Sequence, residues 1–127
     1  MFQVGAIHLE RPILLAPMED VSEQPFRRLC RRFGADLVYT EFVSSEGLIR
    51  AAAKTHAKML LAPDEHPVGI QLLWQLARRA GRGDGAAASQ GPDLIDINFG
   101  CLVKKIACKS GAGSTLREPE LLSSPAR

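Results

Sequence analysis

A cysteine and two lysines follow a short apolar segment in the last third of the chain. Residues 94–98 read Leu-Ile-Asp-Ile-Asn, and Gly100, Cys101, Lys104 and Lys105 come soon after. If the apolar segment is a β-strand, the thiol of Cys101 lies at its C-terminal tip, where parallel α/β folds bind their ligands. The pattern therefore predicts a thiol that meets a bound ligand, although the spacing alone does not name the reaction.

Other polar residues stand near the C-terminal ends of the predicted strands. They are Glu19 and Asp20 with Met18 after the first strand, Glu41 after the second, Gln71 within the third, and Asn98 with Cys101 after the fourth. Because these strand ends meet at one edge of a parallel sheet, we expect the side chains to line one rim. A flat apolar cofactor there needs an amide such as that of Gln71 for its ring edge. For each residue taken alone, a satisfied strand-end polar group is an equally good interpretation.

Four apolar segments with strand character must position these residues. They span 13–16, 37–40, 68–73 and 94–98. Their starts are separated by 24 to 31 residues, the period of βα units, whose parallel strands need a crossover between them. The sequence therefore predicts an α/β fold with a parallel sheet. A short hairpin over 4–9, around Gly5, precedes it.

Helical patterns fill the gaps between the predicted strands. Ser22 is placed to cap the first helix and Gly34 to end it. The predicted buried stripe of this helix consists of Phe26, Leu29, Cys30 and Phe33. The predicted second helix includes Leu48, Ile49 and Ala52. The third must fall within 74–91, where Gly81, Gly83 and Gly85 shorten or fray it, and 86–90 can supply a last turn.

Composition limits the class of protein. The chain has 127 residues, of which 46% are hydrophobic, and its formal net charge is +2. It is long enough for one domain or part of one, but too short for a closed (β/α)8 barrel of roughly 250 residues. The charge is too small to indicate a nucleic-acid partner by itself. The four arginines between residues 27 and 32 are interpreted more simply as a solvated helix face.

Cysteines, histidines and apolar runs indicate the compartment. The three cysteines, among them the loop thiol Cys108, include no C-x-x-C pair, so we expect a reducing cytoplasm rather than a secreted disulfide framework. The first residues show no signal-peptide pattern, and no apolar run approaches the roughly 20 residues of a membrane span. For the same reason we expect no membrane partner. The three histidines lack metal-ligand spacing, so we also expect no metal site.

Eight sequence blocks in a fixed order point to a family. They are 12–21 (PILLAPMEDV), 25–27 (PFR), 34–42 (GADLVYTEF), 67–72 (PVGIQL), 93–101 (DLIDINFGC), 103–105 (VKK), 111–113 (GAG) and 116–117 (LR). In these blocks the chain resembles the tRNA-dihydrouridine synthases, flavoenzymes of the TIM-barrel class, and most closely their bacterial B-type branch. The resemblance covers nearly the whole chain, apart from roughly 73–90 and the residues after 122.

The resemblance implies a fold and a reaction. The fold would be an incomplete (β/α)8 TIM barrel, in which residues 1–127 form about the first four βα units of the FMN-binding catalytic domain. The rest of the barrel and the family's C-terminal helical tRNA-binding domain would lie outside the chain. The reaction would have two stages, in which NADPH reduces FMN and the flavin then passes a hydride to C6 of specific uridines in tRNA, reducing the 5,6 double bond.

The resemblance also assigns roles to residues. Cys101 matches the general acid, which protonates C5 of the uridine; a thiol with an ordinary pKa of about 8.5 is protonated at neutral pH, as a proton donor must be. The residues that would contact the flavin are Ala16, Pro17, Met18 and Gln71. Those that would contact the tRNA substrate are Asn98, Glu41, Lys104 and Lys105.

Three departures from the family qualify this interpretation. Leu102 stands where the family has Pro after its catalytic Cys; residues 73–90 keep the family's length without its helix pattern, which suggests two compensating reading-frame shifts; and the chain ends in the fourth unit. We therefore expect the chain alone to bind FMN poorly and to self-associate through unpaired barrel edges. The alternatives are an inactive truncated or frame-shifted fragment and another flavin-dependent TIM-barrel reductase.

Overall fold

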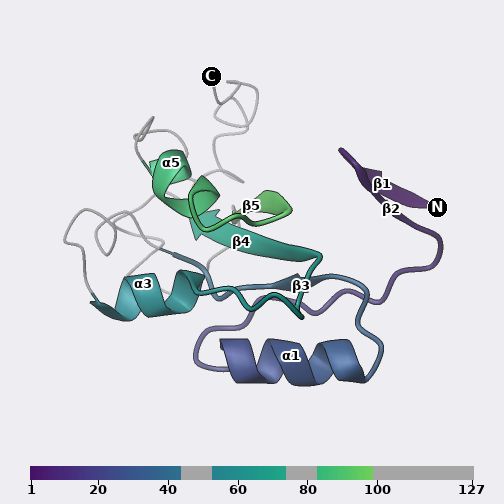
Figure 1. Cartoon of the computed structure of the whole chain (residues 1–127), viewed down its shortest axis with the longest axis horizontal. Coiled ribbons are helices and arrows are strands. Elements are labelled where there is room, and N and C mark those ends of the chain that lie inside the picture. The colour runs from purple at the N-terminus through teal and green to yellow at the C-terminus, as the bar shows by residue number, and fades with distance from the viewer. Residues whose placement is uncertain (44–52, 74–82, 99–127) are drawn as a thin grey trace, which may run out of the picture.

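The computed structural model describes residues 1–43, 53–73 and 83–98. Its elements in chain order are β1 (Phe2–Val4), β2 (Ile7–Leu9), α1 (Gln24–Arg32), β3 (Val38–Tyr39), α3 (Ala53–Met59), β4 (Val68–Leu73), α5 (Gly83–Ala88) and β5 (Leu94–Asn98), as labelled in Figure 1. Strands and helices alternate after the hairpin, so the predicted α/β class is confirmed. No helix within these three ranges has the length and apolar character that crossing a membrane requires.

The hairpin and the parallel sheet both form where the sequence predicts them. β1 pairs antiparallel with β2, and Gly5 between them has φ +55°, a left-handed conformation that glycine adopts without strain. β3, β4 and β5 pair in parallel and in chain order. The predicted hairpin and the last three of the four predicted parallel strands are therefore confirmed, except that the hairpin starts earlier, at Phe2.

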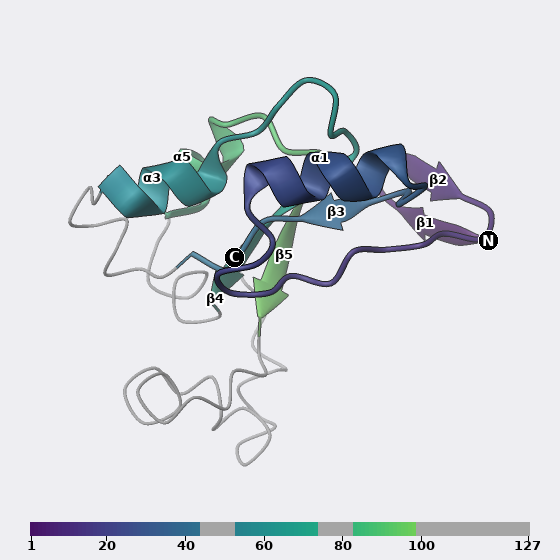
Figure 2. The same ribbon diagram turned by 90° about the horizontal axis from the view of Figure 1, so that it is seen from below.

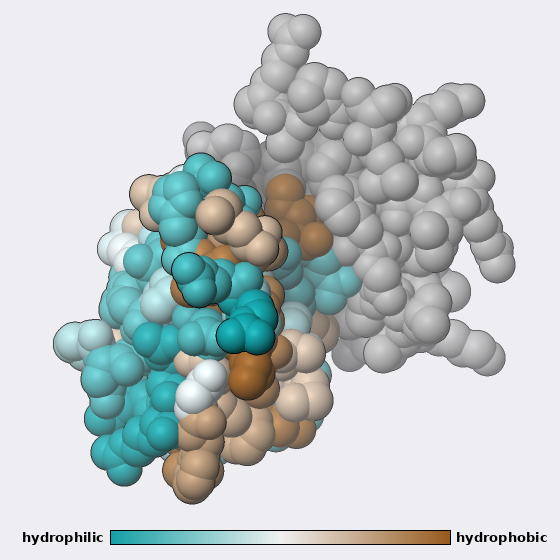
Figure 3. Space-filling view, turned by 90° about the vertical axis from the view of Figure 1, so that its right-hand side faces the viewer, coloured by the Kyte–Doolittle hydropathy of each residue, from teal (hydrophilic) through white to brown (hydrophobic). Residues whose placement is uncertain are grey.

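The predicted first parallel strand is reduced to a single bridge. Leu14 pairs in parallel with Leu37, and the Leu15 N–H donates to the Leu37 carbonyl at 2.9 Å. Just before the bridge, the Ile13 N–H donates to the carboxylate of Asp36 at 2.8 Å. A side-chain oxygen is therefore the acceptor here in place of a main-chain carbonyl. Ile13 is 65% and Leu14 38% exposed, and Figure 3 shows apolar side chains among the hydrophilic ones on the molecular surface.

The helices cover one side of the sheet, and this divides the residues of β4 between two faces. Figure 2 shows α1, α3 and α5 on the same side. Ile70 and Leu72 form the buried core there with Met59 of α3 and Ala87 of α5. Because successive residues of a strand point to opposite faces, Gly69, Gln71 and Leu73 belong to the other face.

That other face is tightly packed at its N-terminal end. Gly69 pairs with Tyr39 on one side and Leu94 on the other. A Cβ atom at position 69 would come within 2.7 Å of the Tyr39 ring and 2.8 Å of Leu94 Cδ1, closer than real contacts allow. Only glycine fits here, and the side chains of Tyr39 and Leu94 cover the sheet at this position.

Helix α1 begins differently from the expectation. The capping residue is Glu23, which makes no side-chain cap bond, and Pro25 lies in the first turn. The predicted cap Ser22 is therefore wrong. Its Oγ instead accepts a hydrogen bond from the Met18 N–H and donates one to the Met18 carbonyl, both at 2.9 Å, so the hydroxyl closes the turn over 18–22.

The predicted buried stripe of α1 is only partly right. Phe26 and Cys30 are half-buried, but Leu29 is 48% and Phe33 84% exposed. The side chain that α1 buries most completely is Arg27, which is 1% exposed. The apolar pattern misses it because arginine is rarely buried unless it is paired. The predicted end of the helix is confirmed, since Gly34 has φ +98° there.

A helix precedes β5, as the sequence predicts, and the expected last turn over 86–90 is partly confirmed. α5 has six residues, and the Ser89 N–H extends its last turn with a 2.9 Å bond to the Gly85 carbonyl. The predicted second helix, with Leu48, Ile49 and Ala52, falls outside the described residues, as do 74–82.

A buried ion pair joins α1 to the segment before β4. Arg27 Nε and Nη2 donate to the two carboxylate oxygens of Glu65 at 2.8 and 3.1 Å, and both side chains are at most 1% exposed. Arg27 also donates to the carbonyls of Ser22 and Leu60, at 2.9 and 2.8 Å. Glu65 accepts the Ala62 N–H at 2.6 Å. Both charges are thus satisfied without water.

Replacing Arg27 with methionine is expected to lower the free energy of unfolding by about 3–5 kcal/mol, because Glu65 is left buried and unpaired. Urea unfolding followed by circular dichroism measures this loss. Converting Glu65 to methionine as well should recover part of it, since an apolar pair carries no uncompensated charge. The control is Arg28→Met, which breaks the exposed pair with Asp64 and should change little. Equal effects of the two arginine variants would contradict the assignment.

Candidate functional site

Three polar side chains form a hydrogen-bonded row on the sheet face opposite the helices. Gln71 of β4 is paired in register with Asp96 of β5, and its Nε2 donates to Asp96 Oδ2 at 2.6 Å. Asn98, which lies two residues further on the same face, donates from Nδ2 to Gln71 Oε1 at 3.1 Å. Gln71 is only 6% exposed. The structure therefore brings together Gln71 and Asn98, two of the predicted site residues.

The strand beside this row contains one extra residue. Tyr39 pairs with Gly69, but Val43 pairs with Leu72, so four steps along the β3 side match three along β4. This is a β-bulge, a feature that re-aims side chains. It places Val43 in the helix-side core with Leu72. Glu41, inside the bulge, is held by Lys58 of α3.

Thr40 connects the bulge to the row. Its Oγ1 accepts the Gln71 N–H at 3.2 Å and donates to the Glu41 carbonyl at 2.9 Å. A side-chain hydroxyl thus bonds a main-chain group at the point where the ladder is interrupted. Thr40 is fully buried, so this connection is shielded from water.

Lys58 ties the loop after the first strand to the end of β3. Its ammonium group lies 3.0 Å from Glu41 Oε2 and also binds Glu19. It stands 5.9 Å from the centre of the Phe42 ring, within the range of a cation–π contact. Glu19 and Glu41, which the sequence places at one rim, are therefore brought together by a lysine that the sequence analysis did not single out.

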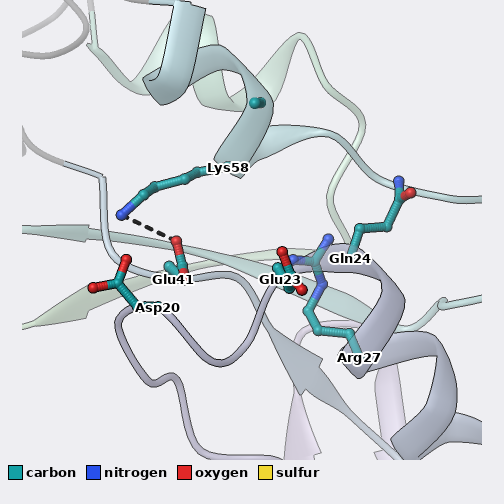
Figure 4. A pocket seen from close by; sticks show the side chains of 7 residues that line it. Asp20, Glu23, Gln24, Arg27, Glu41 and Lys58 are labelled. Atoms are coloured by element: carbon teal, nitrogen blue, oxygen red, sulfur yellow. Dashed lines mark ion pairs between the residues drawn. The ribbon is translucent and has the colours of Figure 1, made fainter.

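An open cavity of about 280 Å³ lies beside this ion-pair group. It is lined by Asp20, Glu23, Gln24, Arg27, Glu41, Ala57 and Lys58. Figure 4 shows Lys58 and Glu41 facing each other on one side, with Asp20 near Glu41, and Arg27 on the other side. Because Glu65 neutralises Arg27, the remaining lining charges are mostly acidic.

The three predicted flavin contacts after the first strand lie in a loop. Ala16 and Met18 are exposed and Pro17 is half-buried, so their side chains are accessible. The turn bonds between Met18 and Ser22 fix the end of this loop.

The remaining predicted site residues, Cys101, Lys104 and Lys105, lie outside the described residues. Two participants, Asp96 and Lys58, were missed. A signal existed for Asp96, because it precedes Asn98 by two positions and so shares its strand face. No comparable signal marks Lys58, since its partners Glu19 and Glu41 are distant in sequence.

The arginine cluster is largely used within the chain. Besides the Arg27 pair, Arg28 binds the carboxylate of Asp64, and Arg31 donates to the carbonyls of Ala35 and His66 at 2.5 Å each. In the part of the chain that the structure describes, no three His, Cys, Asp or Glu side chains gather as metal ligands.

The environments of two groups shift their pKa values upward. Partial burial alone would lower the pKa of Lys58, but the hydrogen bonds and charges of Glu19 and Glu41 outweigh it and hold the pKa above the ordinary 10.5. Burial, and then the charge of Asp96, raises the pKa of Tyr39 above its ordinary 10.0. Both groups therefore hold their protons more tightly in the folded chain.

Lys58→Met should lower the free energy of unfolding at neutral pH by about 1 kcal/mol, because two carboxylates lose a charged partner. The raised pKa means that the lysine's contribution is fully present below pH 10.5 and is lost as the pH rises through the folded value. The difference between the wild type and the variant should therefore shrink above pH 10.5 in urea titrations. Tyr39 titrates in both proteins and cancels. His56→Ala, an exposed change on α3, should show no such convergence.

Comparison with known proteins assigns the family. A family model described as Dihydrouridine synthase (Dus) matches residues 14–125. The tRNA-dihydrouridine synthase B of Pseudomonas syringae pv. tomato is 37% identical over 120 residues, which are 94% of this chain and 35% of that protein. The counterpart from Pseudomonas putida is 36% identical over 122 residues, 96% of this chain and 36% of that protein. The probable tRNA-dihydrouridine synthase of Aquifex aeolicus is 37% identical over 111 residues, 87% of this chain and 35% of that protein.

The chain spans about a third of the length of these curated relatives. Gln71, Asp96 and Asn98 all lie within the matched range of residues 14–125. By this match over most of its length, the chain belongs to the dihydrouridine synthase family.

Proposed function

We propose that residues 1–127 are the N-terminal part of an FMN-binding TIM-barrel domain of a tRNA-dihydrouridine synthase. The further βα units and a helical tRNA-binding domain would be supplied outside this chain. Two observations support the barrel: the strands pair in parallel in chain order, and the helices cover one face. A barrel is built in this way, with the other face turned inward.

The observation that carries the proposal is the row of Gln71, Asp96 and Asn98 on the sheet face opposite the helices, in a chain that belongs to this family. The donor set fits the pyrimidine edge of a flavin. Gln71 uses one N–H on Asp96, and the second N–H of its amide nitrogen would donate to a carbonyl oxygen of the ring. The loop of Ala16, Pro17 and Met18 would lie against the ring.

Bound FMN would supply a hydride, originating from NADPH, to C6 of a tRNA uridine. Cys101 would donate its thiol proton to C5, since a thiol with an ordinary pKa of about 8.5 is protonated at neutral pH. Asn98 would hydrogen-bond the edge of the uridine, which must leave the tRNA stack to enter the site. Lys104 and Lys105 would contact the tRNA backbone, and Glu41, held by Lys58, would form a wall of the substrate pocket.

The chain should bind the flavin ring weakly and without regard to the phosphate. The proposed contacts, Gln71 and the loop 16–18, all meet the ring. Titrations followed by flavin fluorescence should therefore give similar dissociation constants for riboflavin and FMN, on the order of 0.1 mM. Gln71→Ala should weaken both, whereas Gln90→Ala, a change outside the site, should not. Tight stoichiometric FMN binding would contradict the expected weakness, and no binding of either flavin at millimolar concentration would contradict the ring site.

Catalysis can be tested in a chimera. These 127 residues replace the matching third of the Pseudomonas syringae enzyme, and dihydrouridine in tRNA and NADPH oxidation are measured. Cys101→Ala should reduce dihydrouridine formation at least about 100-fold, the scale of a lost general acid, while flavin reduction by NADPH is retained. Cys108→Ala is the matched thiol control and should leave both rates unchanged.

The same chimera separates the remaining alternatives. Turnover of free uracil in preference to tRNA would indicate another flavin-dependent reductase. A chimera that folds and binds FMN but makes no dihydrouridine would support the inactive-fragment alternative.

A further inference from the structure

The hydrogen bonds of the row formed by Asn98, Gln71 and Asp96 all run in one direction, and we infer this direction from Asp96, a residue that has no role so far. We propose that Asp96 is a positioning residue that fixes which ends of the Gln71 and Asn98 amides donate and which accept, and so determines the hydrogen-bond pattern offered to an imide edge. This rests on the proposed function, because the imide edges in question are those of the flavin pyrimidine ring and of uracil.

The geometry gives the row a single direction. Asp96 lies opposite Gln71 in a five-pair parallel register between β4 and β5, so its position is set by the main chain. Its Oδ2 is 2.6 Å from Gln71 Nε2, and Asn98 Nδ2 is 3.1 Å from Gln71 Oε1. Every donor in the row therefore points from Asn98 through Gln71 towards Asp96.

An ionised carboxylate at position 96 makes this direction obligatory for Gln71. The two ends of a glutamine side chain have nearly the same shape, so packing alone does not distinguish Nε2 from Oε1. An ionised carboxylate has acceptors and no donor, so Gln71 must turn its NH₂ group towards Asp96. The Oε1 atom of Gln71 then faces Asn98, and Asn98 donates to it from its own NH₂ group.

The direction matters because an imide edge has a fixed order of acceptor, donor and acceptor. This edge reads the same from both ends, so the orientation counts for a ring that is held in one position, where an amide in the correct orientation meets it with a complementary donor and acceptor. A reversed amide would set oxygen against oxygen and leave polar atoms unpaired, which costs more than a missing contact. Asp96 thus acts on ligand recognition without touching the ligand.

Asp96→Asn is the direct test, because asparagine keeps the shape but can present either a donor or an acceptor. Side-chain amide signals of Gln71 in ¹⁵N NMR spectra of the whole chain report the orientation independently of any ligand. In the wild type, the Nε2 proton on Asp96 should be shifted downfield and exchange slowly with water. In the variant, both features should move towards those of an exposed glutamine.

Riboflavin affinity is the functional readout. Asp96→Asn should weaken it about tenfold, the scale of one hydrogen bond to a ligand. The matched control is Asp93→Asn, the same change just before β5, where the carboxylate binds His66 and the Val68 N–H at 2.6 and 2.7 Å. That variant should bind riboflavin as the wild type does.

A reciprocal swap separates positioning from stability. In Gln71→Glu with Asp96→Asn, residue 96 donates to residue 71, so the strand contact is restored while position 71 loses its N–H. The swap should regain the thermal stability of the wild type but not its riboflavin affinity. The swap also serves as the test if the single variant Asp96→Asn fails to fold. A folded swap that binds riboflavin with wild-type affinity would overturn the proposal.

The outcomes distinguish this inference from the proposed function. If the wild type binds riboflavin and Asp96→Asn binds it equally well, the role of Asp96 is refuted and the flavin site stands. If the wild type binds no riboflavin, the flavin site fails, and the NMR signals alone decide the inference. Gln71 signals that are unchanged in Asp96→Asn would then overturn it.

Discussion

The buried pair of Arg27 and Glu65 is the interaction on which the described structure depends. A charge in the interior is tolerated only when its hydrogen-bonding groups are satisfied. Here the guanidinium meets a carboxylate and two carbonyls, and the carboxylate also takes a main-chain N–H. The pair joins residues 38 positions apart, so it fixes α1 against the segment that leads into β4. With Arg27 turned inward, Leu29 and Phe33 are left largely exposed.

Ser22 connects the Arg27–Glu65 ion pair to the candidate site. The Ser22 carbonyl accepts a bond from Arg27, and its hydroxyl closes the turn on Met18. The loop proposed to lie against the flavin is therefore anchored on one side by the ion pair. On its other side Glu19 is held by Lys58. Two charged contacts, one buried and one at the surface, thus position a loop that has little core of its own.

The sheet separates packing from chemistry. Ile70 and Leu72 of β4 face the helices and form the core, whereas Gln71 of β4 and its partner Asp96 of β5 face the opposite side. The bulge after Tyr39 keeps Val43 in the core while Glu41 reaches Lys58. Without the extra residue, strand alternation would exchange the faces of the residues that follow. A polar row can therefore exist beside a closely packed core without interrupting it.

The hairpin, three of the four predicted parallel strands and the turn glycines Gly5 and Gly34 could be predicted from the sequence alone, because they follow from local periodicity and backbone freedom. It also predicted that Gln71 and Asn98 would share a rim. Tertiary structure decided the buried Arg27, the role of Lys58 and the direction of the amide row. Each of these depends on a partner far away in the sequence or on an adjacent strand, and polar pairing of that kind leaves no period in the chain. Apolar patterning therefore placed the elements, and distant charges and hydrogen bonds set how their polar residues meet.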